Sequence, residues 1–235
     1  MPLSTLYSPT WHLRFGQGGW PNTIDKRGAK EGSELFQGLV SNQWDWKDYE
    51  VALAERKRNL GEPRYFDAVQ CVQPGASDPF VFEALPLTLH PTMGVPVIHG
   101  DAIKGVCRHA MGELMAGDEH LDDAMKALFG LESARGQSIF EDAWWVPTVK
   151  RKQPFFLEVE GHEDVDLLVG STRPISRLAA AGRFAFWLAP VTEGERDWHD
   201  AAAWTALTAT LKHFGVGSRR NVDAYGRMIE VPPTP

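Results

Sequence analysis

Hydrophobic residues after position 80 alternate between strand spacing and helix spacing, and few folds accommodate the resulting order. Strands place apolar side chains at every second position, whereas one face of a helix repeats them at intervals of three and four. The order is strand, helix, strand, strand, helix, strand, which predicts an α+β sandwich of the ferredoxin-like type. The segments are residues 80–89, 101–115, 137–146, 183–189, 198–214 and 224–231.

The helix expected at residues 101–115 has the clearest pattern. Asp101 is expected to cap its N-terminus. Its apolar residues keep the i, i+3, i+4, i+7 spacing of a buried face, while Lys104 and Arg108 are neighbours four residues apart on another face. We therefore expect this helix to pack with one side and to present a basic pair on the other. The apolar stripe comprises Ile103, Val106, Cys107, Ala110, Met111, Leu114 and Met115.

A glycine-rich stretch, K-H-F-G-V-G-S-R-R-N-V-D-A-Y-G at residues 212–226, joins the last expected helix to the last expected strand. Its glycines permit positive φ and close backbone approach, and successive N–H groups in such a loop can form a concavity for anions. Arg219 and Arg220 add two planar cations suited to phosphate. One interpretation is a loop that follows a polyanion backbone. The other is a helix C-cap at Gly215 followed by an ordinary glycine turn.

The remaining segments have weaker patterns. The expected helical stretch before residue 61 falls into two pieces, of which the second begins near Asp45 and ends before Gly61. We expect a single domain over residues 1–235, in which residues 16–80 form a loop and helical insertion. The weaker segments are a strand at residues 10–15, a glycine-rich loop at 16–32, helices at 33–60 and 121–129, and strands at 66–72 and 154–160.

The formal net charge of −7 argues against indiscriminate nucleic-acid binding but is compatible with a local basic surface. Carboxylates concentrate in residues 113–132 and 158–166, so a surface that faces nucleic acid should exclude both segments. Residues 171–182 contain Arg173 and Arg177 and no acidic residue.

The two cysteines, Cys71 and Cys107, support neither a disulfide framework nor a cysteine zinc site, and no metal-binding histidine spacing occurs. We therefore predict no metal and no cofactor. No stretch approaches the roughly 20 apolar residues of a membrane span, and the N-terminus lacks the pattern of a signal peptide. A cytoplasmic location and no membrane partner are the default expectations.

Four motifs occur in a fixed order: V-P-V-I-H-G-D-A-I-K-G-V-C-R at residues 95–108, L-F-G at 128–130, G-Q-S-I-F-E-D-A at 136–143 and F-G-V-G-S-R-R-N-V-D-A-Y-G-R at 214–227. Together they resemble the signatures of the RAMP superfamily of CRISPR systems. Within it, residues 87–96 and 173–186 look most like subunit six of the type III-B Cmr complexes.

The resemblance implies a modified ferredoxin-like domain of the RNA-recognition type with N-terminal insertions. It also implies a non-catalytic subunit that contacts guide RNA and target RNA and packs against other RAMP-type subunits. RNA contact is expected at the basic helix face, the acid-free arginine segment and the terminal glycine-rich loop. The expected RNA-binding residues are Lys104, Arg108, Arg173, Arg177, Lys212, Gly215, Gly217, Ser218, Arg219, Arg220 and Arg227.

This chain departs from the superfamily pattern at several places: His99 replaces the motif proline, Asp223 and Ala224 lengthen the terminal loop, and two further departures change the charge. Asp101 and Ala102 stand where the superfamily has two serines, and Asp101 would repel a close phosphate. Arg219 and Arg220 stand for the usual Lys-Thr and raise the charge of the loop. We therefore expect RNA backbone contact to depend more on the terminal loop than on the helix that begins near Asp101.

Two other functions stay open. A RAMP endoribonuclease needs a catalytic group, for which Asp25 in the early glycine-rich loop is the best candidate, followed by His99 and His109 beside the first motif. A small acidic adaptor that docks on protein partners is the alternative outside nucleic acids. Trp144 and Trp145 are adjacent on an expected strand, so one is expected in the core and the other at a subunit contact or a base.

Overall fold

The computed structural model describes residues 46–75, 87–114, 119–131, 134–160, 175–190, 196–217 and 224–233. The strand expected at residues 10–15 and the loop expected at 16–32 lie outside these ranges. The elements are α3 (Lys47–Leu60), β1 (Arg64–Ala68), β2 (Val97–Ile98), α4 (Gly100–Leu114), α5 (Glu119–Phe129), β3 (Gly130–Leu131), β4 (Ala134–Arg135), β5 (Ser138–Phe140), β6 (Ala143–Val146), β7 (Phe155–Glu160), β8 (Ile175–Ala180), β9 (Arg183–Phe186), β10 (Leu188–Pro190), α6 (Arg196–His213) and β11 (Met228–Val231).

The central sheet has five strands in the order β11-β1-β9-β6-β2, and every neighbouring pair is antiparallel. In chain order its core is β1, α4, β6, β9, α6 and β11, which is the predicted ferredoxin-like arrangement, with β2 added at one edge. The first strand of this core is β1 at Arg64–Ala68 and not a strand at residues 80–89. The core therefore begins earlier in the chain than the hydrophobic pattern indicated.

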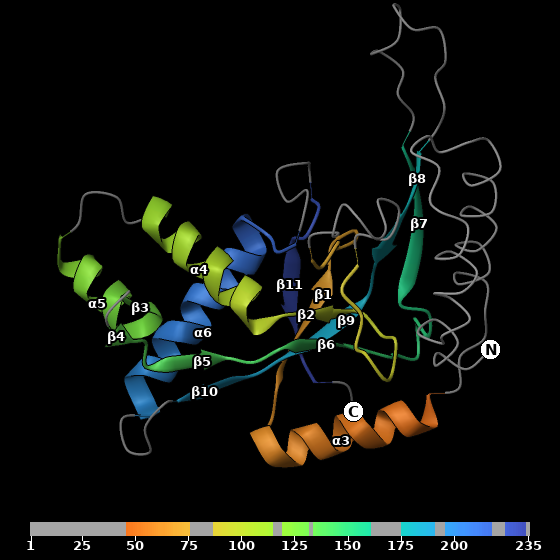
Figure 1. Ribbon diagram of the computed structural model, residues 1–235, viewed down its shortest axis with the longest axis horizontal. Coiled ribbons are helices and arrows are strands. Elements are labelled where there is room, and N and C mark those ends of the chain that lie inside the picture. Colours follow the sequence, from red (N-terminus) through yellow and green to blue (C-terminus); the bar gives the residue numbers. More distant parts are fainter. Residues whose placement is uncertain are drawn as a thin grey trace, which may run out of the picture.

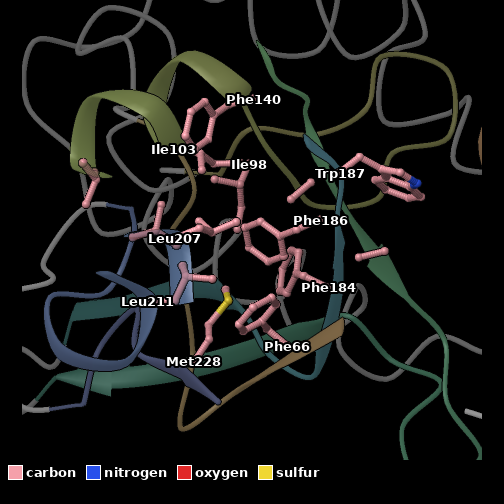
Figure 2. Packing of buried hydrophobic residues seen from close by; sticks show 14 of the residues in the cluster. Phe66, Ile98, Ile103, Phe140, Phe184, Phe186, Trp187, Leu207, Leu211 and Met228 are labelled. Atoms are coloured by element: carbon pink, nitrogen blue, oxygen red, sulfur yellow. The ribbon is translucent and has the colours of Figure 1, made fainter. Parts of the chain in front are cut away.

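Helices α4 and α6 pack on one face of the sheet. Phe66 lies directly opposite Phe184 in the β1–β9 register, so their side chains share a face. Figure 2 shows these rings together with Phe186 and Met228 against Leu207 and Leu211 of α6. All six side chains are buried, which explains why the apolar spacing of α6 was recognisable in the sequence.

Helix α3 packs against the other face, below the sheet in the view of Figure 1. Tyr49 stacks on Trp144 with ring centroids 6.1 Å apart, and its hydroxyl donates to the Trp145 carbonyl oxygen. The guanidinium of Arg56 lies over Trp144, 4.6 Å from the ring centroid, and over Trp187 at 5.1 Å. The helix ends at Gly61, as predicted, where φ is 87°.

Both Trp144 and Trp145 are buried, so the expectation that only one belongs to the core is wrong. Their side chains do alternate along the strand, but α3 covers the face that bears Trp144. The Trp145 ring lies 5.1 Å from the ring of Trp46, and its Nε1 donates to the Ala181 carbonyl oxygen. Neither ring presents an open face for a base.

Two segments predicted as continuous strands are each divided between two sheets. Residues 137–146 form β5 and β6 with a bend at Glu141 and Asp142, and residues 183–189 form β9 and β10 with a break at Trp187. β5 pairs with β10 outside the central sheet. The alternating pattern continues through both bends, which is why the sequence did not reveal them.

The remaining elements complete the molecule. Helix α5 ends at Gly130 as predicted, and β3 and β4 form a short hairpin after it. Strand β7, also predicted, pairs along its length with β8, and Glu158 lies opposite Arg177. Leu114, expected on the buried stripe of α4, is 59% exposed because it lies in the last turn.

Candidate nucleic-acid interface

The N-terminus of α4 is capped by a carboxylate from elsewhere in the chain. The carbonyl of His99 accepts the first helical hydrogen bond, from Ile103 N–H, and the Gly100 N–H donates to Asp142 Oδ1 at 2.8 Å. The other oxygen, Oδ2, lies 3.4 Å from His99 Nδ1. Asp101 is exposed within the first turn, so the prediction that it caps this helix is wrong. The helix begins one residue earlier because the bend between β5 and β6 supplies the acceptor.

The basic pair expected on α4 is accessible. Lys104 is half-buried and Arg108 is exposed, beside the buried stripe that contains Cys107. The thiol of Cys107 is in hydrogen-bond contact with Thr210 of α6. Exposed Lys212 lies two residues beyond Thr210 in the last turn of α6. The three cations therefore lie on two helices that pack against each other.

Gly215 ends helix α6, as the second interpretation of the glycine-rich stretch held. Its φ is 73° and its N–H donates to the Thr210 carbonyl oxygen at 2.9 Å. Val216 N–H donates to Gly226 O at 3.0 Å, and Gly226 N–H donates to Cys71 O at 2.9 Å. These N–H groups are engaged within the protein, so Gly215 acts as the cap of α6. Contact between Gly215 and RNA stays a prediction.

Gly217, with φ of 92°, lies against the backbone of Gln73. The segment that carries Ser218, Arg219 and Arg220 follows it and lies outside the described residues. Beyond that segment, Arg227 is exposed at the start of β11. The described glycines thus fasten the two ends of this segment to the end of β1.

The other predicted residues are more scattered. Arg177 belongs to β8, which pairs with β7 in a sheet separate from the central one. Arg173 and the nuclease candidate Asp25 lie outside the described residues. His109 is exposed on α4, and His99 contacts Asp142 as described above. The structure keeps Lys104 and Arg108 together on α4 and places Arg227 just before β11. Lys212 follows Thr210 by two residues, so it lies on the opposite side of α6 from the contact with α4.

The titratable groups of the described interior are those of a packed core. Burial raises the pKa of the Cys107 thiol to about 12, which keeps it protonated and unreactive. Burial likewise raises the pKa of Tyr49. Among the residues that the structure describes, no three His, Cys, Asp or Glu side chains gather as a metal site requires.

Two features of this surface were not recognised from the sequence. Asp142 was recognised only as part of a motif, and its role depends on a contact between residues 42 positions apart in sequence. The basic turn at Val149–Lys152 was overlooked because a short charged loop is common on any surface. No helix within the described ranges is long and apolar enough to cross a membrane.

The fold and the basic helix face define a ferredoxin-like α+β domain with cations on its helical layer. A family profile described as the RAMP superfamily matches residues 12–228, so the chain belongs to the RAMP superfamily. This confirms the resemblance drawn from the four motifs. No curated protein matches the sequence.

One of three similar solved structures shows the same fold, and the other two are more distant. A chain in the cryo-EM structure of the type III-B Cmr-beta bound to cognate target RNA is 19% identical, with a TM-score of 0.65 over 89% of this chain and 74% of that one. The crystal structure of Cmr6 from Pyrococcus furiosus gives 18% identity and a TM-score of 0.44 over 72% and 96% of the two chains. The crystal structure of oligomeric Cmr4 from Pyrococcus furiosus is 14% identical, with a TM-score of 0.41 over 74% of this chain and 100% of that one.

Proposed function

We propose that this chain is a non-catalytic RNA-binding subunit of a type III CRISPR ribonucleoprotein, where it helps to hold the guide RNA and the guide–target duplex beside other RAMP-type subunits. The observation that carries the proposal is the match of the RAMP superfamily profile to residues 12–228. The similar fold of a chain from a type III-B complex bound to target RNA supports it.

The distribution of charge also supports RNA contact at the helical layer. Lys104, Arg108 and Lys212 are accessible on two adjoining helices, although the chain as a whole carries a net charge of −7. Lysine and arginine contacts of this kind bind phosphate groups and contribute little to the recognition of base sequence. Binding is therefore expected to be weak for the isolated chain, nearly independent of sequence, and strongly dependent on salt.

The test compares charge reversals in matched pairs. The double variant Lys104→Glu and Arg108→Glu changes the net charge by four units, and so does the control Arg58→Glu and Lys126→Glu on α3 and α5. Binding of a fluorescent oligouridylate is measured by anisotropy at several salt concentrations. The salt slope is the steepness with which the logarithm of the binding constant falls as the logarithm of the salt concentration rises. The α4 variant is expected to lower this slope by about 0.7 per lost phosphate contact, and the control variant should leave it unchanged. Equal slopes would show that α4 does not face RNA.

A third pair, Arg219→Glu and Arg220→Glu, tests the ranking inferred from the sequence. We expect it to weaken RNA retention more than a reversal at Lys104, because the loop carries two arginines. An equal or smaller effect would remove this ranking.

The non-catalytic part of the proposal is tested in the assembled complex. Affinity purification from the native host should recover guide RNA and large partner subunits with the chain. Target cleavage by that complex should be unaltered by Asp25→Ala. Loss of cleavage would instead identify an endoribonuclease, and purification of partners without RNA would identify a protein adaptor.

A further inference from the structure

One end of the central sheet gathers segments that lack carboxylates. Ala68 pairs with Met228, and Val146 pairs with Arg183, so the end of β1, the start of β11, the end of β6 and the start of β9 lie side by side (Figure 1). The segments that meet there are residues 68–75, 145–157, 178–184 and 224–229, and none contains Asp or Glu. Acidic residues adjoin these segments in the sequence, namely Asp67, Glu158, Asp223 and Glu230. Of these, Asp67 is paired with Arg183 at 2.8 Å and Glu230 with Arg64 at 3.5 Å.

A tight basic turn projects from this end, between β6 and β7. Thr148 and Arg151 exchange backbone hydrogen bonds of 2.8 and 3.1 Å, and the Thr148 hydroxyl accepts a further bond of 3.0 Å from Arg151 N–H. Trp46 Nε1 donates to the Lys152 carbonyl oxygen at 2.9 Å. These bonds use the backbone and Thr148, so they hold the turn in place while leaving the lysine side chains to other contacts.

The cations of this end are accessible. Lys150, Lys152 and Arg227 are exposed. Arg151 is half-buried, with its aliphatic stem against Gly182. We call Lys150, Arg151, Lys152 and Arg227 the cationic rim. It is distinct from the basic pair on α4, which belongs to the helical layer.

Exposed apolar side chains accompany the rim. Within the described ranges, five large hydrophobic side chains are exposed, and three of them, Val69, Val149 and Ile229, belong to this end of the sheet. Val149 is 90% exposed at the tip of the basic turn, and Val69 donates its N–H to the Arg227 carbonyl oxygen. Aliphatic groups beside cations are suited to a ligand that has both charged and flat apolar parts.

We infer that the cationic rim is a second RNA-binding surface, which takes the phosphate backbone of a single strand on its cations and sugar or base faces on Val149 and Val69. The inference rests on the proposed function. A nucleic acid fits better than an acidic peptide, because its charges repeat along a chain of riboses and bases, and the rim interleaves cations with exposed aliphatics.

The described residues that flank the terminal loop also lie at this end of the sheet. Gly217 lies against the backbone of Gln73, and Gly226 donates to Cys71 O. The segment with Arg219 and Arg220 therefore leaves and re-enters the described chain at the same end of the sheet.

The test uses the full chain and a fluorescent oligouridylate at low and rising salt. Lys150→Glu with Lys152→Glu takes the net charge from −7 to −11, and the control Arg58→Glu with Lys126→Glu does the same. The rim variant is expected to lower the salt slope by about 1.4, at about 0.7 for each contact with a single strand. Val149→Ser is expected to weaken binding without changing the slope. Urea unfolding of each variant checks that the fold is retained.

The outcomes separate this inference from the proposed function. If the rim variant binds RNA like the control while the α4 variant loses affinity, the inference that the cationic rim binds RNA is overturned and the proposed function is not. Failure of the unaltered chain to bind RNA at the lowest salt overturns both. If polyglutamate competes as well as RNA, and the rim variant abolishes both, the rim is a surface for an acidic protein segment and the RNA assignment is overturned.

Discussion

Replacement of Gly226 by alanine tests the packing of the terminal loop most directly. Gly226 has φ of 70°, in the left-handed region. A Cβ added there would lie 2.9 Å from Val216 N and 3.1 Å from Val216 C, and closer still to Val216 O. All three are backbone atoms and cannot turn aside, so both the conformation and the contact oppose the substitution.

The cost can be worked from these two contributions. An L side chain in the left-handed conformation costs about 1–2 kcal/mol, and forcing an extra carbon into a packed site costs about 1–3 kcal/mol. Gly226→Ala should therefore lower the free energy of unfolding by about 2–5 kcal/mol. That is a large part of the roughly 5–15 kcal/mol that stabilises a typical domain.

Gly105→Ala on α4 is the matched control. A Cβ at Gly105 would meet no atom within 4 Å, and alanine favours the helix by about 0.5–1 kcal/mol over glycine. Urea unfolding followed by circular dichroism should show opposite shifts for the two variants. A loss of less than about 1 kcal/mol for Gly226→Ala would refute the packing of the loop described above.

Two further outcomes concern the contacts near Trp144. Asp142→Ala should lower the free energy of unfolding by about 1 kcal/mol through loss of the α4 cap, and Asp142→Asn, which keeps an acceptor, by less; equal losses in urea titrations would contradict the capping role. Burial, and then the positive charge of Arg56, lowers the pKa of His90, against a smaller opposing effect of Asp142. The unfolded chain then binds a proton at His90 more readily, so stability should fall as the pH drops below about 6.5 and level off below the folded pKa. His90→Gln should weaken this pH dependence, and an unchanged profile between about pH 7.5 and 5 would exclude His90 as its source.

The sequence was sufficient for the elements whose patterns are local. Helix α4 keeps an apolar stripe over four turns, and Gly130 and Gly215 end α5 and α6 as glycine C-caps do. The ferredoxin-like order followed from these helices and the strands around them, although its first strand was placed at residues 80–89 instead of at β1. Each of these inferences depends on residues within one or two turns of each other.

The errors arose where distant segments meet. Trp144 is buried because α3 covers it, and no residue near Trp144 in sequence indicates that cover. The bend at Asp142 interrupts a pattern that is apolar on both sides of it. The cationic rim could not be recognised either, since Lys150 and Arg227 lie 77 positions apart and only the strand order brings their segments to one end of the sheet.

The carboxylate of Asp142 restricts how a polyanion can approach α4. A helix begins with partial positive charge and free N–H groups, which make its tip attractive to phosphate. Here one of those donors is already satisfied by a negative group of the protein itself, and exposed Asp101 adds a second negative charge beside it. An RNA strand would be repelled from the tip and would pass along the flank of the helix, where Lys104 and Arg108 follow one another a turn apart.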